Sequence, residues 1–335
     1  MKPLSHIHHQ KGLTLVEIMV AITISLILLS GVIQIFTSNR FTYHVQEELS
    51  RVQENGRFAM HFLTKEIRMA GFTGCASMDN VTNIADIDNN NIADTTSDFT
   101  TGGIDGREQA SLPYNITDAV QLTAAEVNVG TDVLIIKRGT DTGVRLTGNM
   151  NTTNANVQMA TATVNGQFSA DDILIISDCV STDIFGANNV SNGAGTTTIA
   201  HSNAANTGNN LSKNYGADAT VMKFENMTYY IANNPAGAPS LFRKRLGTNV
   251  IITEELVEGV EDMEIVYGQD TDNDNTANRY VPANDATLNM AEVVSVRINL
   301  TLRTIADNVS TVVNNGDRRI RRTYTTTTSI RNRII

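Results

Sequence analysis

The chain has 335 residues, a formal net charge of −10, no tryptophan and five prolines. Its length suffices for one large domain or two ordinary ones, and its acidic balance argues against nucleic-acid binding, because the protein's field would repel phosphates. Threonine, asparagine, aspartate and glycine are abundant in the second half, as is typical of short strands joined by polar turns. This composition excludes an all-helical fold.

An almost unbroken apolar run occupies residues 13–36, and Glu17 is its only charged residue. As a helix this run would be roughly 36 Å long, enough to cross the hydrocarbon core of a bilayer. Lys2 and Lys11 precede the run, so the positive-inside tendency places the N-terminus in the cytoplasm and everything after Arg40 outside. We therefore expect a single membrane-spanning segment and export of the rest of the chain.

The order of features before this run differs from that of a secretory signal. A secretory signal places its apolar region before the cleavage site, whereas here the apolar region follows the candidate site at Gly12. The carboxylate of Glu17 also needs an explanation, because an unpaired charge inside a membrane is costly and such carboxylates usually have a function.

Residues 11–17 read KGLTLVE and resemble the processing site of type IV prepilins. This resemblance implies that residues 1–12 are a leader, that a membrane peptidase cleaves after Gly12 and methylates Leu13, and that Glu17 aligns subunits during assembly. Leu13 departs from the phenylalanine usual in the family, although cleavage depends chiefly on the glycine. Glu17 could then pair with the free α-amino group of a neighbouring subunit's Leu13. The alternative is a plain membrane anchor with an incidental glutamate.

Residues 37–74 are expected to continue the helix as an amphipathic segment that lies on a globular head. Its apolar or small residues recur at spacings of three and four, and clustered glycines end the pattern near Gly71 and Gly74. The apolar positions are Val45, Leu49, Val52, Gly56, Ala59, Leu63, Ile67 and Ala70, and the charged positions between them are Glu47, Glu48, Arg51, Glu54, Lys65, Glu66 and Arg68. The charged face is either a subunit contact or simply solvated.

Several further segments of this chain resemble the PilW family of minor pilins. They are residues 53–59, 67–75 (IRMAGFTGC), 176–179, 260–268 and 331–333. The resemblance implies a place in the initiating complex at the tip of a type IV pilus. The implied partners are other minor pilins, the major pilin, a large tip adhesin and the prepilin peptidase. The implied roles are assembly, adhesion, twitching motility or DNA uptake.

The head, residues 75–335, is expected to be mainly β-structure, which makes the chain an α+β protein: a long N-terminal helix packed on an antiparallel β head. Strand-like runs occur at 118–123, 132–138, 171–177, 220–231, 249–253, 259–267 and 291–304. Residues 229–231 and 241–243 flank a turn sequence and predict a hairpin. Residues 76–112 and 185–218 are predicted to be long polar loops.

Two cysteines, Cys75 and Cys179, both follow the apolar run. In an oxidising exported compartment we expect them to form a disulfide that ties the end of the helix to the head, with a stabilisation of roughly 4–5 kcal/mol in the chain-entropy model. The alternative is two independent buried thiols.

A calcium site is one interpretation of the oxygen-bearing side chains at alternate positions from 270 onward. They are Asp270, Asp272, Asp274, Thr276 and Asn278. The glycine and the glutamate of the usual calcium loop are replaced by Asn275 and Val281, and a solvated acidic turn is the other interpretation. A looser version of the spacing occurs at Asp86, Asp88, Asn90 and Asp94.

Catalytic motifs are lacking: the sequence has no phosphate-binding loop, no Gly-x-Ser-x-Gly and no His-Glu-x-x-His. We therefore expect a structural protein that lies in the inner membrane before assembly and on the cell-surface pilus afterwards. A type II secretion pseudopilin would share residues 12–36 and differ in the head. A membrane-anchored periplasmic enzyme or binding protein is the second alternative, and it predicts an uncleaved N-terminus.

Overall fold

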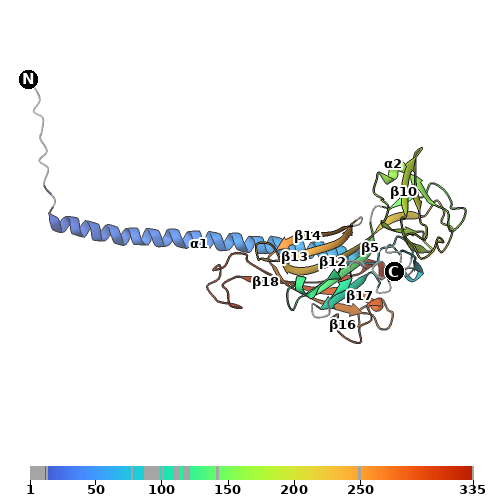
Figure 1. Cartoon of the computed structure of the whole chain (residues 1–335). Helices are drawn as coiled ribbons and strands as arrows, with labels where there is room; N and C mark the ends of the chain where they lie inside the picture. Colours follow the sequence, from blue (N-terminus) through green and yellow to red (C-terminus); the bar gives the residue numbers. More distant parts are fainter. Residues whose placement is uncertain are drawn as a thin grey trace, which may run out of the picture.

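A long helix that projects from a β-rich head is the main feature of the computed structural model (Figure 1). The helix, α1, spans Leu15–Arg68 without interruption. The α+β fold class predicted from the sequence is confirmed, with the long helix packed on a mainly antiparallel head. The structure describes residues 12, 14–76, 78–86, 99, 102–108, 113–115, 121–140, 143–247 and 250–333.

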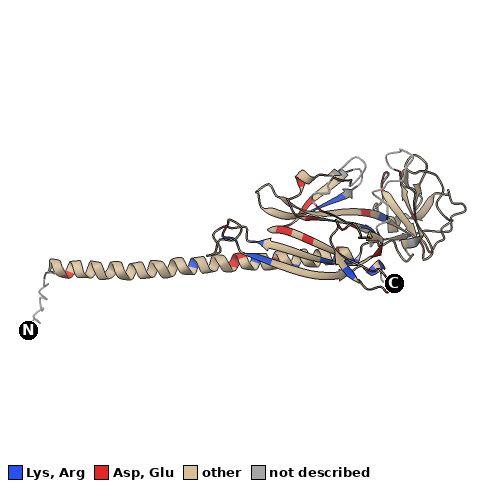
Figure 2. Cartoon of the chain, turned by 90° about the horizontal axis from the view of Figure 1, so that it is seen from below, with Lys and Arg blue, Asp and Glu red and all other residues tan. Residues whose placement is uncertain are grey.

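No other described part of the chain covers the first half of α1. Large apolar side chains from Leu15 to Phe36 are exposed, and this part of the helix extends away from the head in Figure 1. Figure 2 shows one acidic position near the start of the helix and no other charge before the basic residue Arg40. The apolar surface of the first half is therefore left for another partner, such as lipid or neighbouring helices.

The second half of α1 packs on the head through a narrow stripe. Its buried apolar or small residues follow the three- and four-residue spacing of one helix face. They are Val52, Gly56, Ala59, Leu63 and Ile67. The helix ends at Arg68, slightly before the predicted end, because the chain turns back at Gly71 (φ +72°), whose N–H donates to the carbonyl of Lys137 at 2.9 Å.

Two sheets face each other across the main core, and α1 lies along one open side of this pair, in contact with β14, β17 and β18. The first sheet has the path β5-β12-β13-β14, with β2 beside β5, and the second has the order β16-β15-β17-β18. The chain passes directly from β14 to β15 through Gly259 (φ +86°). The strands are β2 (Ile104–Glu108), β5 (Asp132–Gly139), β12 (Thr220–Asn233), β13 (Pro239–Gly247), β14 (Val250–Glu258), β15 (Val260–Gln269), β16 (Arg279–Val281), β17 (Val293–Arg303) and β18 (Arg321–Ser329).

A smaller lobe extends from the end of the head that lies away from α1's free half (Figure 1). The first half of β12 continues the first sheet into it through β8, β9 and β1, with β6 also beside β12, and a separate sheet has the order β10-β11-β7. Among the described strands only the β1–β9 pair is parallel. The elements are β1 (Val81–Asn83), β6 (Val144–Arg145), β7 (Val157–Ala160), the helix α2 (Thr161–Val164), β8 (Ile173–Ser177), β9 (Thr182–Gly186), β10 (Asn189–Gly193) and β11 (Thr196–Ala200).

Short elements complete the head. The strands β3 (Tyr114–Asn115) and β4 (Gln121–Leu122) pair with each other. Single turns of 3₁₀ helix occur at Met78–Asn80, Ala124–Glu126, Met290–Glu292 and Arg331–Arg333.

The predicted strands at 132–138, 171–177, 220–231, 249–253, 259–267 and 291–304 are found as β5, β8, β12, β14, β15 and β17, and the predicted hairpin is β12–β13. Of the predicted strand at 118–123, only residues 121–123 are described, and β4 covers two of them. The prediction of a long loop at 185–218 was wrong, because β9 ends there and β10 and β11 form a hairpin. The predicted loop at 76–112 likewise contains β1 and β2, each paired with a neighbouring strand.

Candidate functional site

The start of α1 is built around a reciprocal cap between Thr14 and Glu17. The Thr14 backbone N–H and hydroxyl both donate to Glu17 Oε2 at 2.9 Å, and the Glu17 N–H donates to Thr14 Oγ1 at 3.3 Å. This arrangement satisfies N–H groups that a helix start leaves without intrahelical partners. In a single chain the Glu17 carboxylate thus has partners within its own helix end, which sequence reasoning did not foresee.

The other residues of the predicted processing site lie close to this cap. Gly12 is exposed and comes two residues before the cap residue Thr14. Leu13, the predicted N-terminal and methylated residue, lies outside the described residues, as does most of the predicted leader. The proposed contact between Glu17 and a neighbour's α-amino group remains a prediction, and the cap, which uses Oε2, would leave Oε1 for it.

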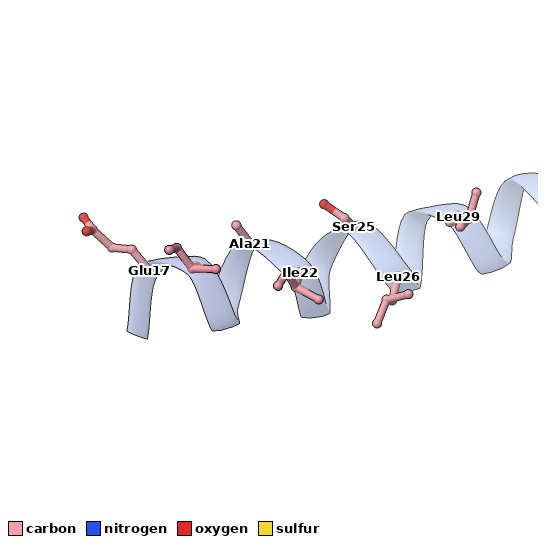
Figure 3. A pocket seen from close by; sticks show the side chains of 7 residues that line it. Glu17, Ala21, Ile22, Ser25, Leu26 and Leu29 are labelled. Atoms are coloured by element: carbon pink, nitrogen blue, oxygen red, sulfur yellow. The ribbon is translucent and has the colours of Figure 1, made fainter. Parts of the chain in front are cut away.

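Small and polar side chains continue from Glu17 along one side of the helix. Figure 3 shows Glu17, Ala21 and Ser25 on the same side, spaced four residues apart, while Leu26 points the other way. A shallow hollow of about 330 Å³ lies along this part of α1, and small residues of this kind let another helix approach closely. The residues that line it are Glu17, Ile18, Ala21, Ile22, Ser25, Leu26 and Leu29.

The predicted disulfide is present. Cys75, which follows the end of α1, is bonded to Cys179, which follows β8, and the two residues are 104 positions apart. The bond joins the chain leaving the helix to the smaller lobe, so that the helix end, the main core and the lobe are connected covalently as well as by packing.

Two contacts that sequence reasoning missed fix the second half of α1 to the head. Gly56 lies directly under the ring of Tyr324 on β18, and the Tyr324 hydroxyl donates to the carbonyl of Val52 at 3.4 Å. Glu66 forms an ion pair with Arg138 on β5, with 3.2 Å between Glu66 Oε2 and Arg138 Nη2. Burial raises the pKa of Glu66, and the Arg138 guanidinium opposes that rise.

Two residues of the predicted charged face are therefore not solvated. Glu66 is only 4% exposed, and Glu48, at 5%, accepts a hydrogen bond from the backbone N–H of Ala306 at 3.3 Å. The prediction of a charged face that is either solvated or in contact with another subunit was wrong for these two residues, because both are buried against the head. Their partners on β5 and in the loop before β18 are distant in the sequence, and no local pattern could have indicated them.

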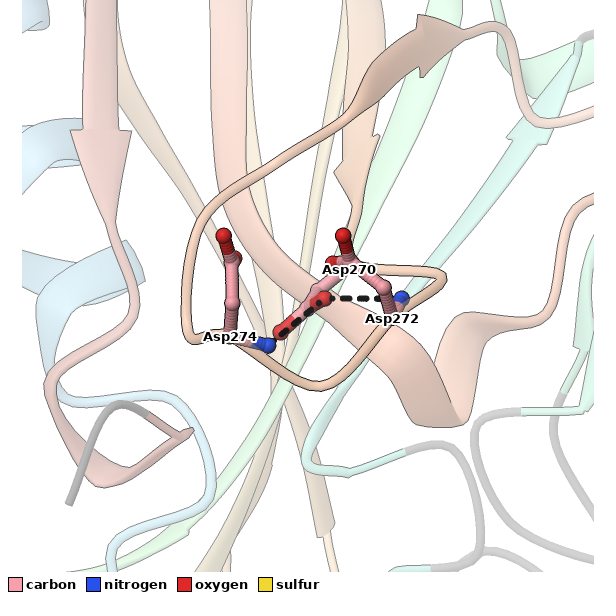
Figure 4. Close-up of side chains that lie close together, drawn as sticks. All are labelled: Asp270, Asp272 and Asp274. Atoms are coloured by element: carbon pink, nitrogen blue, oxygen red, sulfur yellow. Dashed lines mark hydrogen bonds between the residues drawn. The ribbon is translucent and has the colours of Figure 1, made fainter.

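The predicted calcium loop connects β15 to β16 and brings three carboxylates together (Figure 4). One oxygen from each of Asp270, Asp272 and Asp274 lies within 4.8 Å of the others. Asp270 accepts backbone N–H groups from residues 272, 274 and 275 at 2.8–3.3 Å, and these hold the pKa of its carboxyl below the usual value although burial acts in the opposite direction.

Of the remaining two predicted ligands, Asn278 has its side-chain oxygen engaged within the loop. The side-chain oxygen of Asn278 accepts from the N–H and hydroxyl of Thr271, and the backbone N–H of Thr276 donates to Asp274. The loop thus folds on hydrogen bonds of its own, and calcium binding stays a prediction. In the looser acidic segment only Asp86 is described, while Asp88, Asn90 and Asp94 lie outside the described residues.

Comparison with known proteins gives two family matches. Residues 228–332 match the family described as Type IV Pilus-assembly protein W, and residues 7–33 match the prokaryotic N-terminal methylation motif. The curated proteins and the solved structures contain no match to the chain. The first match includes the resemblance noted at 260–268, whereas those at 53–59, 67–75 and 176–179 lie outside it. The C-terminal third of the chain is therefore similar to the PilW family, and its N-terminal region carries a prepilin-type methylation motif.

Proposed function

We propose that this chain is a minor pilin, a structural subunit of the complex that initiates a type IV pilus and remains at its tip. The observation that carries the proposal is the first half of α1: an exposed apolar helix of the length needed to span a membrane, most of which lies within the match to the methylation motif at residues 7–33. An apolar helix that no described part of its own chain covers needs lipid first and neighbouring helices later.

In this proposal the precursor lies in the inner membrane with its N-terminus in the cytoplasm. The prepilin peptidase cleaves after Gly12, Leu13 becomes the methylated N-terminus, and the side of the helix that carries Glu17, Ala21 and Ser25 meets the helix of the next subunit. The major pilin, other minor pilins and a large tip adhesin are the partners. The head supports adhesion, twitching motility or DNA uptake through these contacts, without an enzymatic step.

The role of Glu17 can be separated from its role as a helix cap. Glu17→Ala removes both the charge and the cap, whereas the matched variant Thr14→Ala removes the capping hydroxyl and keeps the charge. Loss of a cap costs about 0.5–2 kcal/mol. If Glu17 docks on a neighbour's amine, Glu17→Ala inserts normally in the membrane and is lost from pili, while Thr14→Ala assembles. Equal assembly of both variants would refute the docking role.

A deletion strain tests the proposed function against the secretion alternative. We expect loss of surface pili with normal protein secretion, restored by the wild-type gene. Normal pili with defective secretion would instead identify a type II secretion pseudopilin.

A further inference from the structure

The segment between β17 and β18, residues 304–320, extends from the head beside α1. The end of β18 lies near the end of the helix, because Asn332, three residues after β18, donates to the carbonyl of Ala70 at 3.0 Å. β17 is antiparallel to β18, so β17 starts there. β17 then runs back along α1, and Ala306, just after it, donates to Glu48. The segment therefore leaves the head in the direction of the apolar half of α1, as both Figure 1 and Figure 2 show.

The tip of this segment carries apolar side chains that nothing in the described chain covers. Val312 is 67% exposed and Val313 is 59% exposed, although most other large apolar residues of the head are buried. The tip is ordered by its own hydrogen bonds: Ser310 N–H donates to the Arg318 carbonyl at 2.7 Å, and Asn314 N–H to the Asp317 carbonyl at 2.8 Å. Two adjacent valines are thus held outward at a defined place.

The reach of the segment matches the level at which the membrane would end. Exposed aromatic residues mark that level on α1: Phe36, Phe41 and Tyr43, with the Arg40 guanidinium over the Phe36 ring at 5.7 Å. From Glu48 to Tyr43 the helix covers about 8 Å, and the six residues from Ala306 to Val312 span at most about 20 Å. The valines can therefore lie level with the aromatic residues without full extension of the chain.

We propose that the 304–320 segment is a second membrane contact, which inserts Val312 and Val313 among the lipid headgroups of the outer leaflet while the precursor waits in the membrane. Exposed Arg318, next to the tip, lies close to anionic headgroups in this arrangement. The contact rests on the proposed function, since it requires α1 to span the bilayer. It fixes the tilt and rotation of the head before assembly and is released when the subunit is extracted.

Because the chain has no tryptophan, a single introduced tryptophan reports on its own surroundings. The full-length variant Val312→Trp is reconstituted in vesicles of phosphatidylethanolamine and phosphatidylglycerol with a nitroxide quencher on the lipid headgroup. Val180→Trp is the matched control, since Val180 is similarly exposed, at 65%, but lies beside Cys179 beyond the end of α1. Phe36→Trp reports whether α1 is in the bilayer.

We expect the quencher to remove most of the emission of Val312→Trp and Phe36→Trp and to leave Val180→Trp unchanged. Replacing phosphatidylglycerol by phosphatidylcholine should reduce the quenching of Val312→Trp alone, and so should the second substitution Arg318→Ser. Quenched Phe36→Trp with unquenched Val312→Trp would overturn the lipid contact and leave the proposed function intact, pointing to solvent or another subunit at the tip. Absence of quenching at Phe36→Trp would contradict the membrane-spanning helix itself.

Discussion

Substitution of Gly56 by alanine is predicted to loosen the attachment of α1 to the head. A Cβ at Gly56 would lie 2.4 Å from Cε2 of Tyr324, so the ring must shift and its hydroxyl must give up the Val52 carbonyl. Alanine is better than glycine within a helix by about 1 kcal/mol, whereas overpacking costs about 1–3 kcal/mol. Loss of the hydrogen bond costs about 1 kcal/mol more, so we expect the free energy of unfolding to fall by about 1–3 kcal/mol in total.

The measurement is urea unfolding of the full chain in detergent micelles, followed by circular dichroism, with thermal unfolding as a second readout. A loss of 1 kcal/mol should lower Tm by about 2–4 °C. Gly31→Ala is the matched control, because an added Cβ there has no neighbour within 4 Å, and it should cause no loss.

The same substitution in a Tyr324→Leu background isolates the clash. There, Gly56→Ala should be neutral or stabilising by up to about 1 kcal/mol, which corresponds to a coupling of about 1–4 kcal/mol between the two positions. An equal loss in both backgrounds, or no loss in the wild type, would refute the close contact between the helix and β18.

Three further predictions concern the head. Cys75→Ser should lower the free energy of unfolding, measured with denaturant, by about 4–5 kcal/mol under non-reducing conditions. In excess reductant the substitution should have no effect. Two free thiols in non-reducing mass spectrometry of the wild type would contradict the bond. Burial, with the carboxylates of Glu108 and Glu264 nearby, raises the pKa of Asp132 from 3.8 to about 8. Between these two pH values the folded state keeps a proton that the unfolded state releases. Stability should therefore fall as the pH rises from about 4 to 8. Asp132→Asn should remove most of this slope, worth about 1–3 kcal/mol after solvent screening, and an unchanged slope in pH-dependent unfolding would exclude Asp132 as its source. Calorimetry with CaCl₂ should give heat that Asp270→Asn abolishes, and no heat at millimolar calcium would end the calcium hypothesis.

The sequence was informative wherever a local pattern determines the structure. The apolar run predicted the free half of α1, because composition alone decides whether a helix suits lipid. Alternation of apolar and polar residues predicted β17, whose inner positions Val296, Ile298, Leu300 and Leu302 are all buried. The two cysteines could be paired because the expected export of the head leaves them in an oxidising compartment.

The sequence was uninformative where distant contacts decide. β18 reads RRTYTTTTS and offers no apolar alternation, so its place beside β17 depends on backbone pairing and on one tyrosine that meets Gly56. The hairpin of β10 and β11 is polar, and its composition predicts a loop instead of paired strands. Glu48 has its partner 258 residues away in the sequence, which no periodicity along the helix can indicate.

At the start of α1, the sequence predicted the importance of Glu17 but not its partner. Thr14 and Glu17 have the spacing of a capping box, and the structure shows both of its hydrogen bonds. The carboxylate that the sequence predicts to meet a neighbour's amine is thus held at its own helix end through Oε2, and docking on a neighbour could use Oε1 without loss of the cap.

The N-terminus of the protein in sheared and purified pili tests the central claim most directly. Mass spectrometry of the N-terminal peptide should find the chain among the pilus proteins, with the first twelve residues removed and Leu13 as an N-methylated first residue. Recovery of the chain only in the inner membrane, with Met1 intact in cells whose prepilin peptidase is active, would contradict the assignment as a pilin.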